Sequence, residues 1–197
     1  MRTPADIADP KEVAALWRMG WLDGPTIAAV CMRWLETDLD QGDTAIAAMA
    51  GEPDLLVSDI AADFERALRT LVGDIPQGDE AILIILRLHL AFALAGDDLI
   101  DGVSLLIQRF ISMSERRLVH HPNRVHDRPD QMFAQQELGL EYVYGAYFAF
   151  DDIQHLSGQP KAYAKAHADC LKALRDDTQV LHDHLAKVLA SPVAERV

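Results

Sequence analysis

Two polar residues interrupt the most apolar part of the chain, residues 81–96. Arg87 and His89 stand there among leucines, isoleucines and alanines. An unpaired buried ion is costly, so Arg87 needs a carboxylate, and Glu137 and Glu141, four residues apart on a predicted helix, are the favoured partners. The group could form a polar site in a helix bundle, with Arg87 binding an anion and His89 acting as acid or base. Alternatively it is a structural ion pair, the interpretation that we favour.

Asp151 and Asp152 are alternative partners for Arg87, and Asp152 is also a potential metal ligand. Asp152 and His155 have the spacing of one half of a di-metal site in a four-helix bundle. Such a site needs a Glu from each of two helices and a Glu-x-x-His from each of two others, and the sequence has no second motif of this kind. Asp152 and His155 thus make only half of such a site, and we expect neither a metal there nor a cofactor.

Residues 116–128 gather basic side chains in an otherwise acidic protein. They could bind a phosphate, a carboxylate ligand or an acidic patch on a partner. Three histidines within seven residues could instead hold a metal, but no spacing places them on one helical face. The favoured explanation is a helix C-terminus whose cations complement the helix dipole before an exposed loop. The residues are Arg116, Arg117, His120, His121, Arg124, His126 and Arg128.

Acidic residues dominate positions 36–65, which contain no Lys or Arg. A surface of one sign speeds association with a basic partner and repels acidic ones, so this segment predicts a docking face for a basic protein. A solvated face that keeps the protein soluble explains the same residues. The residues that we expect to bind the partner are Glu36, Asp38, Asp40, Asp43, Glu52, Asp54, Asp59 and Asp63, and Glu65 ends the segment.

Composition narrows the possible functions. The chain has 197 residues, with 18 Lys and Arg against 31 Asp and Glu, a net charge of -13. This charge disfavours nucleic acid and membrane surfaces as partners. The sequence lacks GxSxG, P-loop, GxGxxG and HExxH motifs, which favours a protein without catalytic activity. Two cysteines far apart, no secretory signal and no apolar span indicate a cytoplasmic location.

Helix formers, turn residues and apolar spacing together predict an all-α protein. We expect one domain over 1–197, a multi-helix bundle or a short curved helical array with about seven or eight helices. A subdivision into acidic helices at 1–75 and central and C-terminal helices at 76–197 is also open. A tight turn at 157–160 predicts a long C-terminal helical hairpin. The predicted helices span about 10–22, 25–39, 43–50, 52–72, 80–95, 97–119, 130–156 and 161–190.

Residues 13–71 resemble the opening of several small all-α bacterial proteins. The shared features are a Gly-aromatic turn at Gly20 and Trp21, Trp34 inside the second helix, an acidic end to that helix, and a short Ala-rich helix ending in Gly-Glu-Pro-Asp. Some of these proteins are uncharacterised, and others are immunity proteins that neutralise a toxin from a neighbouring gene. The resemblance covers about a third of the chain and implies binding through an acidic surface, with no site residue to carry over.

Three hypotheses follow. The first is a non-catalytic, immunity- or adapter-like protein whose acidic helical face binds a basic protein. The second is a helical-bundle enzyme or a small-ligand or metal-binding protein that uses the polar residues around Arg87. The third is a homo-oligomer, a possible homodimer, in which the C-terminal hairpin packs against its copy.

Overall fold

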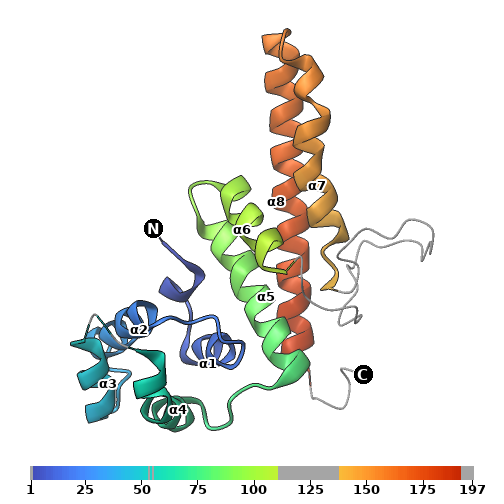
Figure 1. Ribbon diagram of the computed structural model, residues 1–197. Helices are drawn as coiled ribbons and strands as arrows, with labels where there is room; N and C mark the ends of the chain where they lie inside the picture. Colours follow the sequence, from blue (N-terminus) through green and yellow to red (C-terminus); the bar gives the residue numbers. More distant parts are fainter. Residues whose placement is uncertain (1, 53, 55, 111–137, 192–197) are drawn as a thin grey trace. The chain divides into compact units, whose positions relative to one another are not determined.

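Helices joined by turns and loops, without any strand, make up the parts of the chain that the computed structural model describes, residues 2–52, 54, 56–110 and 138–191 (Figure 1). These residues form eight α-helices and two short 3-10 helices, which confirms the predicted all-α class. The α-helices are α1 (Pro10–Arg18), α2 (Gly24–Glu36), α3 (Thr44–Ala50), α4 (Val57–Val72), α5 (Gly78–Ala95), α6 (Leu99–Phe110), α7 (Glu141–Asp152) and α8 (Pro160–Ala190). The 3-10 helices are η1 (Pro4–Asp6) and η3 (Gln154–Leu156).

Aspartate side chains cap the first three α-helices. Asp9 accepts a hydrogen bond from the Glu12 amide at 2.8 Å, and the Glu12 side chain accepts one from the Asp9 amide at 2.9 Å. Asp23 caps α2 through the Thr26 amide at 2.9 Å, and Asp43 caps α3 through the Ala45 amide at 2.8 Å. Each carboxylate satisfies an amide that has no partner within its own helix.

Helix α1 ends at Arg18 and α2 at Glu36, each earlier than predicted. Gly20, at φ 68°, follows α1, and Asp38, at φ 54°, follows α2. Both residues have left-handed backbone, which an α-helix does not continue through. The apolar residues that suggested longer helices therefore lie in turns.

Two later helices begin after their predicted starts. Helix α4 begins at Val57 rather than at residue 52. Helix α7 begins at Glu141 rather than at residue 130, because Gly139 stands just before it at φ 69°. It ends at Asp152, and η3 takes the place of its expected last turn. The predicted helical positions 111–119 and 130–137 lie outside the described residues.

The chain divides into two compact units, residues 1–88 and 89–197, with the border inside α5. In the first unit, α2 packs against α3, and α4 contacts both α1 and α3. An aromatic group forms part of its core: the Phe64 ring stacks on Trp34 at 6.1 Å and meets Trp17 edge-on at 5.1 Å. Phe64 and Trp34 are fully buried, so α2 and α4 are fixed against one another.

The second unit contains the expected long C-terminal hairpin. Helices α7 and α8 lie side by side in Figure 1, joined by η3, and α6 contacts α7. Buried residues of α8 begin at Leu174 and continue through Thr178, Leu181 and Leu185, all on one face of the helix. Near the border of the units, Gly102 of α6 packs tightly against Ala93 of α5.

Candidate functional site

The acidic residues predicted to bind a partner all lie at the surface of the first unit. They are distributed from the last residue of α2, through the α2–α3 loop and the α3–α4 loop, to the outer side of α4. Two of them, Asp40 and Asp43, are partly covered, and the other six are exposed: Glu36, Asp38, Glu52, Asp54, Asp59 and Asp63. The structure thus places the carboxylates where a partner can reach them, without assigning them one.

Some of these carboxylates also shape the α2–α3 loop. Asp40 accepts a hydrogen bond from the Gly42 amide at 3.0 Å, and Asp43 caps α3. Gln41 and Gly42, like Asp38, have positive φ values of 52° and 77°. The loop is therefore built by its own acidic side chains, a pattern usual for Asp in turns.

Two arginines reduce the negative charge of α4. Arg66 lies 2.8 Å from Asp63, and Arg69 lies 2.7 Å from Glu65, both as exposed pairs one helical turn apart. Both arginines come just after the acidic segment 36–65 in the sequence. The surface of α4 is therefore less negative than the composition of that segment suggests. The uncompensated charge is concentrated at residues 36–54.

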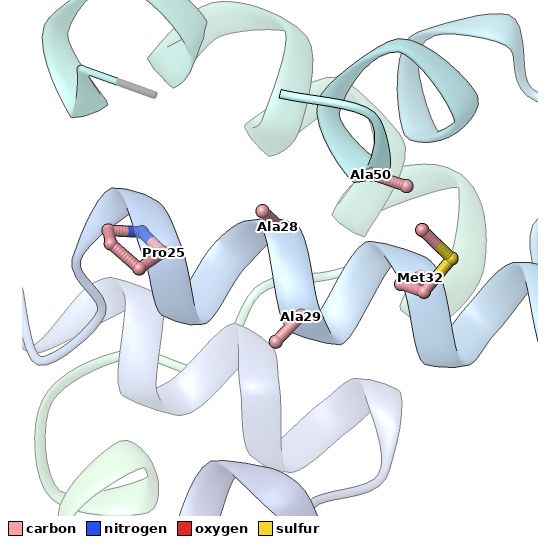
Figure 2. Close-up of a pocket in the computed structure, with 5 residues that line it drawn as sticks. All are labelled: Pro25, Ala28, Ala29, Met32 and Ala50. Carbon is pink, nitrogen blue, oxygen red and sulfur yellow. The ribbon is translucent and has the colours of Figure 1, made fainter. Parts of the chain in front are cut away.

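An apolar groove lies on α2 beside this acidic stretch. Figure 2 shows Pro25, Ala28, Ala29 and Met32 along α2, with Ala50 at the end of α3 close to Met32. The groove is open and has a volume of about 310 Å³. The Met32 side chain is 43% exposed, although methionine belongs among the more buried residue types.

Sequence reasoning missed this groove, although a signal for it exists. The four α2 residues are spaced i, i+3, i+4 and i+7, which makes a second stripe beside the one that faces the core. Glu36 continues the groove stripe one turn beyond Met32, and Glu52 follows Ala50 by two residues. Exposed carboxylates thus follow the groove residues closely in the sequence on both α2 and α3.

Arg87 pairs with Glu12 of α1 instead of the predicted Glu137 or Glu141. Its Nη2 atom lies 2.7 Å from Glu12 Oε1, and the two side chains are 30% and 9% exposed. Burial raises the pKa of the Glu12 carboxyl, and the Asp9 amide and the Arg87 guanidinium lower it to a lesser degree. This pair supports the interpretation of Arg87 as part of a structural ion pair. Glu12, which closes the capping box of α1, is the carboxylate that Arg87 of α5 needs.

The remaining members of the predicted buried polar group belong to the second unit or are not described. His89 and Glu141 are buried, 3% and 7% exposed, and the His89 ring meets Phe110 edge-on at 5.4 Å. Glu137 lies outside the described residues. Neither compact unit by itself contains the whole predicted group around Arg87.

Asp152 and His155, the predicted metal candidates, do not lie on one continuous α-helix as expected. Asp152 ends α7 while His155 lies in η3, and His155 Nδ1 is 2.7 Å from the main-chain oxygen of Asp152. Both side chains are exposed. In the described parts of the chain, no three His, Cys, Asp or Glu residues are grouped so as to hold a metal ion.

The basic residues at 116–128 lie outside the described residues, so the anion site predicted there remains a prediction. Within the part of the chain that is described, no helix is both long and apolar enough to cross a bilayer. Comparison with protein-family models, with curated proteins and with solved structures found no significant match.

Proposed function

We propose that the protein is a non-catalytic binding protein that docks a basic protein partner on the acidic surface of its first unit. The observation that carries this proposal is an open apolar groove on α2 and α3, together with exposed carboxylates close to its lining residues in the sequence: Glu36 follows Met32 by four residues and Glu52 follows Ala50 by two. An adapter or an immunity protein, the class that residues 13–71 resemble, would use a surface of this kind. The free cysteines, Cys31 and Cys170, are consistent with a reducing, cytoplasmic setting.

The two parts of this surface would do different work. An apolar centre supplies most of the affinity of an interface, and a charged rim supplies orientation and a faster approach. Ala28, Ala29 and Ala50 have short side chains that admit a close neighbour, and Met32 can adapt to its shape. The partner segment that fits has an apolar side chain flanked by Lys or Arg.

Charge reversal at the rim tests the proposal. Proteins from the source organism are captured on the immobilised chain at low and at high salt, and the wild type is compared with Glu36→Lys/Glu52→Lys. The control, Asp74→Lys/Asp97→Lys, makes the same change of charge at exposed residues that belong neither to the lining of the groove nor to residues 36–65. We expect the rim variant to lose a basic protein that the wild type and the control retain, with weaker retention at high salt. Retention by all three chains would refute the acidic docking face.

A neutral substitution tests the groove separately from the charge. Ala29→Gln fills the groove without adding charge, and Ala173→Gln makes the same change at an exposed alanine of α8. We expect only Ala29→Gln to lower the affinity for the captured protein, by about tenfold, roughly 1.4 kcal/mol. Equal affinity of both variants would show that the partner does not use the groove.

The alternative hypothesis is a helical-bundle enzyme or a small-ligand or metal-binding protein around Arg87 and His89. It receives less support, because Arg87 already pairs with Glu12 and the metal candidates are exposed. Elemental analysis distinguishes the two hypotheses. Stoichiometric iron, manganese or zinc in the purified protein would favour the alternative.

A further inference from the structure

The outer part of the C-terminal hairpin has no buried side chain. Between residues 144 and 173, which cover most of α7, η3 and the first half of α8, every side chain is exposed or half-buried. We call these residues the hairpin arm. The arm is rich in apolar residues, and Tyr144, Tyr147, Phe148 and Phe150 all come from α7. Two helices alone do not enclose a core, so the arm leaves aromatic surface uncovered.

The aromatic residues of α7 point to two different neighbours. Phe150 meets His167 of α8 at 5.1 Å, and His167 in turn lies 5.9 Å from Tyr163. These rings fill the contact between the two helices of the arm. Residues 142–150 contain no charged side chain, however, and a helix that is apolar on all sides is normally covered on more than one.

A second aromatic group lies on α7 itself. Phe148 is 4.4 Å from Tyr144 and 5.2 Å from Tyr147, measured between ring centroids, and Phe148 is 39% exposed. Gly145 belongs to the same stretch and is exposed, and a Cβ placed on it would meet no atom within 4 Å. Helix α7 therefore presents rings and, one turn before Phe148, an exposed glycine that lets a neighbouring helix approach closely.

The charges of the arm favour a second copy of the chain as that neighbour. The arm carries three acidic residues, Asp151, Asp152 and Asp169, and three lysines, Lys161, Lys165 and Lys172, so its net charge is zero in a chain of net charge -13. A strongly basic or acidic partner finds no complementary field there. A copy of the arm meets no net repulsion, and two hairpins packed face to face make a four-helix bundle.

We propose that the protein forms a homodimer through the hairpin arms, with the Tyr144, Tyr147 and Phe148 face of α7 at the interface. The face of the arm is two helices wide, each helix being about 10 Å across, and α7 is about 18 Å long. The area that each partner buries is therefore smaller than the roughly 800 Å² that is usual for a stable interface. The dimer should therefore be weak and reversible. Its interface is formed by α7 and α8 of the second unit, whereas the acidic residues belong to the first unit, so the proposal does not depend on the proposed binding function.

Sedimentation of the full chain between about 1 and 100 µM tests the dimer. We expect the mass to rise from 21.8 kDa towards twice that value with concentration. Phe148→Glu should remain monomeric throughout, because a buried unpaired charge opposes association. Leu39→Glu is the matched control: Leu39 is 42% exposed in the first unit, and its variant should dimerise like the wild type.

Gly145→Gln gives a second variant, one helical turn before Phe148, at a position where a Cβ meets no atom within 4 Å. It should also stay monomeric, and circular dichroism should show unchanged helix content. A wild-type chain that is monomeric at every concentration overturns the proposal. Dimerisation of Phe148→Glu or of Gly145→Gln at wild-type strength overturns it as well.

Discussion

Arg87 and Glu12 form an ion pair across 75 positions of the sequence, with Arg87 Nη2 2.7 Å from Glu12 Oε1. The same Glu12 side chain closes the capping box of α1 through the Asp9 amide. One carboxylate thus completes the start of α1 and connects that helix to α5. Because it is nearly buried, its charge depends on the arginine for compensation.

Replacing Arg87 by methionine should destabilise the first unit. Arg87→Met keeps much of the aliphatic length but leaves the Glu12 carboxylate buried without its cation. We expect a loss of about 2 kcal/mol in the free energy of unfolding at neutral pH, less than for a fully buried pair because Arg87 is partly exposed. Urea denaturation measures the loss. Glu12→Gln/Arg87→Met should recover part of it, and a double variant as unstable as Arg87→Met would argue against charge compensation.

The pH dependence of stability should show the contribution of Glu12. Burial raises its pKa above the ordinary 4.5, so the folded chain holds this proton more tightly than the unfolded chain. The stability from this group is complete below pH 4.5 and is lost as the pH rises through the folded-state pKa. Glu12→Gln does not titrate, so the wild type should lose stability relative to this variant as the pH rises above 4.5. Parallel curves for the two proteins would contradict the raised pKa.

Local signals in the sequence predicted the starts of the first three α-helices well, but the starts of α4 and α7 and the ends of α1 and α2 less well. Asp9, Asp23 and Asp43 each cap a helix within two or three residues, so the sequence contains the whole interaction. Left-handed backbone interrupts a helix, and the helices predicted over 25–39 and 130–156 ran through two such positions, Asp38 after α2 and Gly139 before α7. The periodicity of apolar residues alone does not reveal such a break in a helix.

The candidate site was predicted only in part for the same physical reason. Exposed acidic residues are recognisable from their composition, and those of residues 36–65 lie at the surface as expected. The partner of Arg87 is tertiary information, because Glu12 and Arg87 meet only when α1 packs near α5. The α2 groove was visible as a second apolar stripe, but only the structure shows that Met32 is left uncovered there.

Removing the cap of α2 should have a measurable cost. Asp23→Ala leaves the Thr26 amide without its acceptor, and we expect a loss of about 1 kcal/mol in the free energy of unfolding. Asp23→Asn retains an oxygen acceptor and should cost only a few tenths of that. The hydrogen bonds to Thr26 lower the pKa of Asp23, so its stabilisation is present above pH 3.8 and is lost as the pH falls below that value. Thermal denaturation of both variants at neutral and acid pH makes the comparison.

The two cysteines should differ in reactivity. Burial and the nearby Asp43 raise the pKa of the Cys31 thiol to about 12, so it has almost no thiolate at pH 8. Cys170 is only half-buried on α8. A disulfide reagent such as Ellman's should modify one thiol of the folded protein and the second only after denaturation, and Cys170→Ser should abolish the fast reaction. A rapid reaction of Cys31 in the folded protein would show that the core of the first unit opens easily.

Two helical glycines should respond in opposite directions to the same substitution. A Cβ on Gly102 would lie 2.6 Å from the Ala93 Cα and 2.8 Å from its Cβ, so α6 must move away from α5. We expect Gly102→Ala to destabilise the second unit by about 1 to 3 kcal/mol. Gly145→Ala adds its methyl group to open space on α7 and should stabilise that helix by about 0.5 to 1 kcal/mol, because alanine is the better helix former. Urea denaturation at a concentration where the chain is monomeric measures the free energy of unfolding of both variants. Equal changes would show that the close contact of α5 and α6 is not retained in solution.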